Sequence, residues 1–160
     1  MADTAAVSPE ETYLRSRTLI VPVQGVKPNQ LQDSFSATRS GGRTHLAIDI
    51  MAKRGTPVLA ADDGFVLRVA TNRLGGKVVF LTDPERTLVY YYAHLDRQQR
   101  GLRVGQRIRQ GDQIGTVGHT GNAVPSAPHL HFQIMAMGPN GRWWEGPSLN
   151  PYPALRRAVE

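Results

Sequence analysis

Histidines are the residues of this chain with the clearest capacity for chemistry. The sequence has five histidines and no cysteine, and four of the histidines lie in segments with the apolar spacing of β-strands. His129 and His131 are separated by one residue, so a strand would place both imidazoles on one face, about 7 Å apart. Two imidazole nitrogens at that spacing can converge on one metal ion.

A histidine and a carboxylate share one face of an earlier segment. In residues 44–50 the alternation places His45, Ala47 and Asp49 on one side and aliphatic residues on the other. A fully extended strand separates positions four apart by roughly 13 Å, so both groups can reach one ion only if the strand bends and residue 47 is small. Alanine meets that size condition. The alternative is a buried strand that carries one exposed histidine and one exposed aspartate.

The fourth of these histidines, His94, lies near the end of an aromatic segment, residues 87–95. Alternation places Tyr92 on the face of His94 and Tyr91 on the opposite face. We therefore expect Tyr92 to bring a hydroxyl near the site and Tyr91 to lie in the core. Alternatively, His94 is a half-buried strand residue whose ring is hydrogen-bonded to a neighbouring backbone group.

Four imidazoles and one carboxylate, without cysteine, suit a Zn²⁺ ion that is bound by two histidines and one aspartate. Such a site leaves an open position for water, which is the arrangement of catalytic zinc. A structural zinc site normally closes its shell with four protein ligands, and usually with thiolates. The sequence therefore predicts one catalytic Zn²⁺ per chain.

The elements that must position these residues are short strands. From Leu19 onward, apolar runs are interrupted every eight to twelve residues by some of the 16 glycines and 11 prolines, a spacing typical of antiparallel sheet proteins. Helix is expected to be nearly absent. The pattern thus predicts an all-β protein built from an antiparallel sheet, with strands at residues 44–50, 57–60, 64–70, 77–83, 87–95, 113–117 and 129–137.

Length and composition exclude several classes of protein. A chain of 160 residues with 40% hydrophobic residues fits one soluble globular domain. Its apolar stretches, such as residues 19–23, are far shorter than the roughly 20 residues of a membrane-spanning helix. A net charge of +6 favours a polyanionic partner, either nucleic acid or an anionic cell envelope. Because no nucleic-acid-binding motif is present, we expect no nucleic-acid partner and no integral membrane segment.

Three motifs resemble those of a known family, the lysostaphin-like (LytM-type) zinc metallopeptidases that cut peptide bonds in bacterial cell walls. They are His45-Leu-Ala-Ile-Asp49, Tyr92-Ala-His-Leu95 and His129-Leu-His131, in the family's order. Connecting segments such as Gly111-Asp-Gln-Ile-Gly115 are also similar to the family pattern, so the resemblance covers roughly residues 19–152. Ala47 departs from the pattern, since the family usually has glycine there.

The resemblance implies roles for individual residues. His45, Asp49 and His131 would bind the zinc, and His94 and His129 would be the catalytic pair that does not bind it. The family usually has an arginine that corresponds to either Arg39 or Arg43 here. We expect substrate contacts from four residues, which are Tyr92, Arg39, Arg43 and Asn122.

The resemblance also implies a fold, a location and a substrate. The fold would be a sandwich of the barrel-sandwich-hybrid or duplicated-hybrid-motif type, with long loops around a zinc groove. We expect a flexible N-terminal tail at residues 1–17, the zinc metallopeptidase domain at 18–153 and a C-terminal tail at 154–160, with room for one helical turn in each tail. Peptidoglycan peptides would be the partner of a monomeric protein. It would be periplasmic or secreted, with the signal peptide removed, because residues 1–9 lack the pattern of one.

Two other functions remain open at this stage. One is a catalytically silent domain that binds the cell wall or activates another hydrolase. The other is a biotinyl or lipoyl carrier or a sugar-phosphotransferase module, which residues 104–115 resemble. A carrier needs a lysine at a hairpin tip, and Lys27, Lys53 and Lys77 are not in such a context. The pair Trp143-Trp144 could line a substrate cleft or pack against the sheet.

Overall fold

The computed structural model describes residues 7–36 and 45–158. Its helices and strands run in the order α1 (Pro9–Ser16), η1 (Pro28–Gln30), β1 (Ile48–Met51), β2 (Pro57–Leu59), β3 (Gly64–Asn72), β4 (Gly76–Thr82), β5 (Leu88–Gln98), β6 (Arg107–Ile108), β7 (Gln113–Val117), β8 (His129–Ala136), η3 (Pro139–Gly141), η4 (Trp143–Glu145), β9 (Ser148–Leu149) and α2 (Tyr152–Arg156). Six of the seven predicted strands correspond to β2, β3, β4, β5, β7 and β8, and the seventh, residues 44–50, is a strand only from Ile48 onward, in β1. The predicted all-β class is confirmed.

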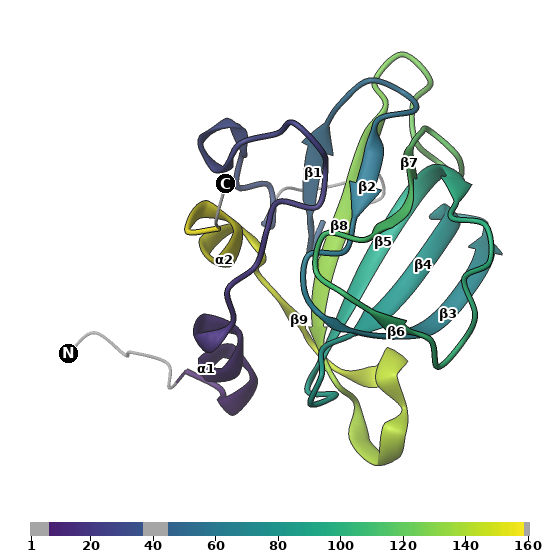
Figure 1. Ribbon diagram of the computed structural model, residues 1–160. Coiled ribbons are helices and arrows are strands. Elements are labelled where there is room, and N and C mark those ends of the chain that lie inside the picture. The colour runs from purple at the N-terminus through teal and green to yellow at the C-terminus, as the bar shows by residue number, and fades with distance from the viewer. Residues whose placement is uncertain (1–6, 37–44, 159–160) are drawn as a thin grey trace.

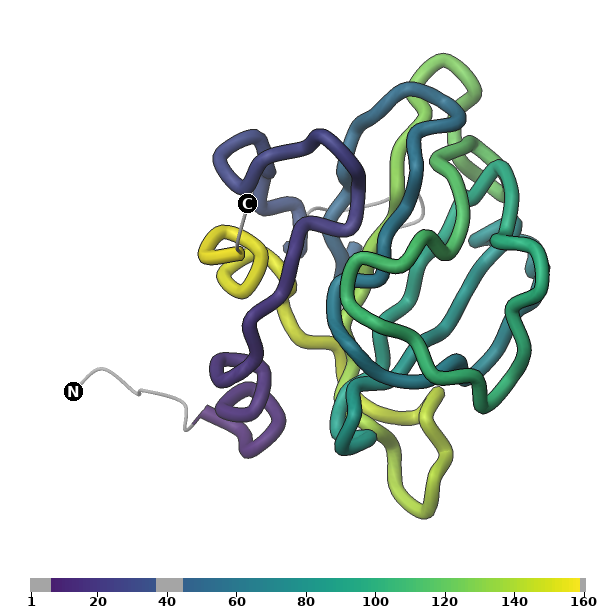
Figure 2. Tube along the Cα trace, viewed as in Figure 1, coloured from purple at the N-terminus to yellow at the C-terminus, as the bar shows by residue number. Residues whose placement is uncertain are grey.

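One antiparallel sheet organises the fold (Figure 1). Its main path has the strand order β1-β8-β5-β4-β3-β6, while β7 pairs with β2 and β5, and β9 pairs with β8. The segment from β6 to β7 passes over β3, β4 and β5, so the sheet closes on itself around a core (Figures 1 and 2). Strands β1, β8 and β5 are neighbours, and these strands carry most of the predicted site.

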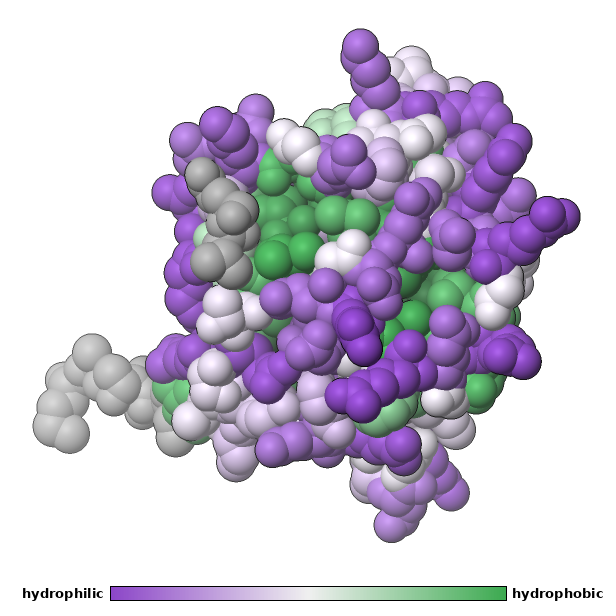
Figure 3. Space-filling model, viewed as in Figure 1, coloured by the Kyte–Doolittle hydropathy of each residue, from purple (hydrophilic) through white to green (hydrophobic). Residues whose placement is uncertain are grey.

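Strand β8 shows why the sequence forms this sheet. Leu130, Phe132 and Ile134 are fully buried on one face, while the alternate residues are only partly buried on the other. Burial of each large apolar side chain stabilises the fold by about 1.5–3 kcal/mol. That burial determines the register, because a slip of one residue would turn the apolar face towards solvent. In the view of Figure 3 most of the surface is hydrophilic, and apolar residues show mainly in areas between the polar side chains.

Helix α1 lies within the segment expected to be an N-terminal tail, and helix α2 overlaps the segment expected to be a C-terminal tail. Residues 9–16 form helix α1, which begins at Pro9 after Ser8, and the Ser8 hydroxyl accepts a hydrogen bond from the N–H of Glu11. Leu14 of α1 is buried, and so are Ala154 and Leu155 of α2. The two helices lie on the same side of the sheet (Figure 2). Isolated apolar residues of this kind form no periodic pattern, so the sequence does not show that these helices pack against the core.

A buried carboxylate joins the N-terminal segment to the sheet. Asp62, which is 4% exposed, accepts hydrogen bonds from Arg17 Nε at 2.9 Å and Arg17 Nη2 at 2.7 Å. The buried Tyr90 hydroxyl also donates to Asp62, at 2.7 Å. The Asp62 carboxylate is therefore the hydrogen-bond acceptor for both a cation and a buried hydroxyl, which come from different parts of the chain.

Replacing Asp62 by alanine should lower the free energy of unfolding by about 3 kcal/mol, because the Tyr90 hydroxyl and the Arg17 guanidinium would both lose their acceptor. Urea denaturation measures this loss. Asp96→Ala is the matched control, since it removes the ion pair with Arg54, whose side chain is 63% exposed, and should cost at most about 1 kcal/mol. Equal losses in the two variants would contradict the role of Asp62.

Candidate active site

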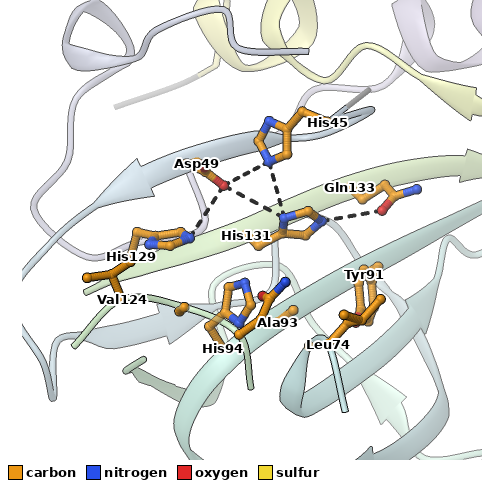
Figure 4. A pocket seen from close by; sticks show the side chains of 13 residues that line it. His45, Asp49, Leu74, Tyr91, Ala93, His94, Val124, His129, His131 and Gln133 are labelled. Atoms are coloured by element: carbon orange, nitrogen blue, oxygen red, sulfur yellow. Dashed lines mark hydrogen bonds and ion pairs between the residues drawn. The ribbon is translucent and has the colours of Figure 1, made fainter. Parts of the chain in front are cut away.

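Three side chains converge on one point between β1 and β8 (Figure 4). Asp49 and His131 are register partners on these strands, and His45 precedes β1. His45 Nε2 lies 2.9 Å from Asp49 Oδ1 and 3.2 Å from His131 Nδ1. Asp49 Oδ1 lies 3.7 Å from His131 Nδ1. Within the described part of the chain, these residues are the single group of three or more histidines and carboxylates with the geometry to hold a metal ion.

A local backbone bend brings His45 to Asp49. Leu46 has a φ of 57°, which lies in the left-handed region that non-glycine residues seldom adopt. Ala47 is fully buried, so a larger side chain there would have to displace its neighbours. Strand β1 begins only at Ile48, and the segment before it turns back instead of extending. The bend and the small residue 47 that a shared metal site requires are both present.

Hydrogen bonds define which ring nitrogen of each histidine faces the cluster. His45 Nδ1 lies 3.0 Å from the carbonyl oxygen of Ser34. A carbonyl only accepts, so Nδ1–H is the donor in that contact, and Nε2 is the ring nitrogen that faces Asp49. His131 Nε2 faces the Gln133 side-chain oxygen at 3.4 Å, which leaves Nδ1 for the cluster. Burial, followed by the nearby His45, lowers the pKa of His131 to about 4, so its ring is neutral near pH 7.

The donor set fits Zn²⁺. Two neutral imidazole nitrogens and one carboxylate oxygen are a common set of protein ligands for catalytic zinc. Each imidazole also donates its other N–H to an oxygen outside the cluster, which is the usual way in which a protein orients metal-binding histidines. His45, Asp49 and His131 are therefore the residues that could hold a metal ion, through Nε2, Oδ1 and Nδ1 respectively.

Two further histidines line the same cavity without belonging to this cluster. The ring of His94 lies 5.0 Å from that of His129 and 5.7 Å from that of His131, measured between centroids. His94 Nδ1 donates to Thr120 O at 2.7 Å, and His129 Nδ1 donates to Ala127 O at 2.9 Å. Their Nε2 atoms thus keep lone pairs when the rings are neutral. Burial lowers the pKa of His94, which favours the neutral ring.

The position of His94 depends on a close contact between two loops. Its backbone N–H donates to Gly75 O at 2.7 Å, while Thr120 O accepts from its ring. A Cβ atom on Gly121, which has a φ of 74°, would lie only 2.4 Å from Leu74 O, so this approach requires glycine. The Thr120-Gly121 pair therefore places the carbonyl that orients the His94 ring.

The expected positions of Tyr91 and Tyr92 are reversed. Tyr92 is fully buried, and its hydroxyl accepts from the N–H of Ala61 at 3.0 Å. Tyr91 lines the cavity instead, with its ring 5.8 Å from that of His131. The cause is His94, whose φ of 62° interrupts the alternation of β5. Parity counted back from His94 consequently selects the wrong tyrosine, and the substrate contact expected of Tyr92 is replaced by one available to Tyr91.

The remaining predicted residues have different outcomes. Asn122 lines the cavity, and its N–H donates to Leu74 O at 3.0 Å. Arg39 and Arg43 lie outside the described residues. The sequence reasoning missed Gln133, although alternation two residues beyond His131 would have found it. The cavity has a volume of about 520 Å³ and is lined by His45, Asp49, Leu74, Gly75, Tyr91, Ala93, His94, Asn122, Ala123, Val124, His129, His131 and Gln133.

Known proteins share both the sequence pattern and the fold. The sequence profile of peptidase family M23 matches residues 43–145. The chain is 36% identical over 96 residues to the peptidoglycan DD-endopeptidase ShyC of Vibrio cholerae, covering 60% of this chain and 21% of that protein. It is 35% identical over 121 residues to the L-Ala–D-Glu endopeptidase of Bacillus subtilis, covering 72% and 36%.

A solved structure gives the same result. The catalytic domain of the antimicrobial peptidase lysostaphin from Staphylococcus simulans matches with a TM-score of 0.62 and 25% identity, covering 91% of this chain and 96% of that one. The fold and the cluster thus define a domain of the metallopeptidase class. The chain belongs to peptidase family M23. It spans about a fifth of the length of the Vibrio relative and about a third of that of the Bacillus relative.

Proposed function

We propose that this chain is a zinc-dependent endopeptidase domain that hydrolyses peptide cross-links or stem peptides of bacterial peptidoglycan. The observation that carries the proposal is the pairing of the His45–Asp49–His131 cluster with His94 and His129 in one open cavity. The names of the relatives, a DD-endopeptidase and an L-Ala–D-Glu endopeptidase, support peptidoglycan as the substrate. Residues 18–153 are the proposed extent of the catalytic domain.

The roles of the residues follow from their chemistry. Zn²⁺, when bound, supplies a Lewis acid that makes hydroxide available near neutral pH. His45, Asp49 and His131 would hold it. Hydrolysis also needs a base that takes a proton from the attacking water and a donor for the oxyanion that forms at the scissile carbonyl. The Nε2 atoms of His94 and His129 are the groups in the cavity that suit these two tasks.

Two features make His94 and His129 suited to proton transfer. Their Nδ1–H groups are anchored to backbone carbonyls, so each ring has one defined orientation. His129 Nε2 lies 3.6 Å from Asp49 Oδ1, and it therefore faces the same volume as the cluster. A neutral ring can accept the proton of water, and a protonated ring can donate to the oxyanion.

The cell envelope is the proposed place of action, either in the periplasm or after secretion, and the proposed state is a monomer. The net charge of +6 suits the anionic polymers found there. In the described residues, no helix has the length and apolar character that crossing a membrane requires.

Digestion of purified cell walls tests this proposal. Walls with two types of cross-link, incubated with the zinc-supplied chain, should release fragments whose new termini identify the cleaved bond. A strong chelator should abolish the release, and added zinc should restore it. Release that is unaffected by chelator would exclude the metal mechanism, and no release from either wall type would favour a silent wall-binding domain.

A further inference from the structure

A second cavity adjoins the first, and the proposed hydrolysis does not use it. It has a volume of about 380 Å³, and its lining includes Arg68, Phe80, Trp143 and Trp144. Tyr91 and Gln133 line both cavities. The two cavities therefore adjoin at these two residues, and a substrate that extends beyond the cluster can continue into the second cavity.

The register of the sheet shows that the floor is continuous. Arg68 on β3 pairs with Phe80 on β4, Phe80 pairs with Tyr91 on β5, and Tyr91 pairs with Gln133 on β8. This row of four side chains lies two residues along the strands from the row of Ala93, His131 and Asp49. Side chains two apart share a face, so both rows line the same side of the sheet.

Aromatic rings form most of the second cavity. The Phe80 ring lies 4.5 Å from that of Tyr91, with an angle of 27° between the planes, and 4.6 Å from that of Trp143. Trp143 thus packs on the sheet, while the neighbouring Trp144 remains 61% exposed. A large exposed aromatic beside an aromatic floor offers apolar contact area that the fold itself does not use.

A positive charge lies at the end of the row remote from the cluster. Arg68 is exposed, and among the described residues no carboxylate forms an ion pair with it. Three strand spacings separate β8 from β3, which is roughly 14 Å. An extended peptide covers that distance with about four residues. A carboxylate about four residues from the bond at the cluster would therefore reach the Arg68 guanidinium.

We propose that the second cavity is a subsite for one anionic peptide arm of the substrate, with the arm lying on Phe80 and Tyr91, covered by Trp144, and its carboxylate bound by Arg68. This inference rests on the proposed function for its substrate class. It adds that the enzyme distinguishes free carboxylates from amidated ones on an arm several residues from the scissile bond. A guanidinium is suited to this distinction because it binds a carboxylate through two parallel hydrogen bonds.

Peptide binding by the zinc-supplied full chain carrying His129→Ala, which removes turnover, provides the test. The probes are a synthetic peptidoglycan stem peptide with free carboxylates and the same peptide with every carboxylate amidated, each titrated by calorimetry. The free peptide should bind at least about tenfold more tightly. Adding Arg68→Gln should remove this preference, whereas Arg107→Gln, which removes the same charge from β6, should keep it. Trp144→Ala should weaken the binding of both peptides by about three- to tenfold.

Several outcomes would overturn the subsite. One is that the preference for the free-carboxylate peptide survives Arg68→Gln, or that Arg107→Gln removes it equally. The others are that neither peptide binds, or that a peptide-free glycan strand displaces the bound peptide. Wall digestion by the chain without substitutions is measured separately. Absence of digestion together with Arg68-dependent binding would refute the proposed function but not the subsite. Digestion together with binding that does not depend on Arg68 would refute the subsite alone.

Discussion

Replacing His131 by alanine is expected to remove stoichiometric zinc and to lower the rate of peptidoglycan hydrolysis by about 10³-fold or more. The loss follows because His131 supplies one of only three donor atoms in the cluster, and a Lewis acid contributes several kcal/mol to stabilisation of the transition state. Elemental analysis of the purified variant measures the zinc, and release of wall fragments measures the rate.

His119→Ala is the matched control for this experiment. His119 is a half-buried histidine that does not line the cavity, so its loss should leave the zinc content and the rate close to their original values. Retention of one zinc per chain and of full hydrolysis in His131→Ala would show that the ligand assignment is wrong. Asp49→Asn should behave like His131→Ala, because an amide is a poorer zinc ligand than a carboxylate.

Loss of either non-ligand histidine should separate zinc binding from catalysis. His94→Ala and His129→Ala are each expected to keep one zinc per chain and to lose about 10²- to 10⁴-fold in hydrolysis, because a positioned acid or base contributes that much. Both variants should still sediment with purified walls. Since the surface carries a net charge of +6, this retained binding should weaken as salt increases.

The two measurements together distinguish an enzyme from a wall-binding domain. A binding domain needs neither histidine, so it would show unchanged sedimentation and no hydrolysis in any form of the chain. Turnover at the original rate in both variants would instead contradict the roles proposed for His94 and His129. Zinc loss in His94→Ala would place that ring in the metal cluster, contrary to the geometry, because the ligand atoms that lie within 4.8 Å of one another belong to His45, Asp49 and His131.

Much of the sheet and of the metal cluster could be predicted from local patterns. Strand β8 alternates strictly, so its buried residues and the shared face of His129 and His131 follow from period two alone. The types of the donor residues were equally readable, because imidazole and carboxylate without thiolate define the class of metal site. The family resemblance was needed to assign the roles of individual residues. Spacing alone did not decide whether His45 and His94 belong to a functional site or are ordinary strand residues.

The packing of helices α1 and α2 against the rest of the fold could not be predicted from the sequence. Helix α1 buries Leu14 alone, which leaves no apolar periodicity for a pattern to detect. The stability of this helix comes from contacts distant in sequence, such as the hydrogen bond from the Tyr13 hydroxyl to Asp83. Such contacts exist only after the sheet has formed.

The sequence by itself determined the chemical types in the site and the strands that carry them, because side-chain chemistry and alternation are local properties. Only the tertiary structure decided how these groups meet. The left-handed backbone of Leu46 folds His45 back to Asp49, and that of His94 moves Tyr91 to the cavity and Tyr92 to the core. Each conformation is unfavourable for an isolated residue. The surrounding packing and hydrogen bonds stabilise it, and these interactions form between segments that are far apart in the chain.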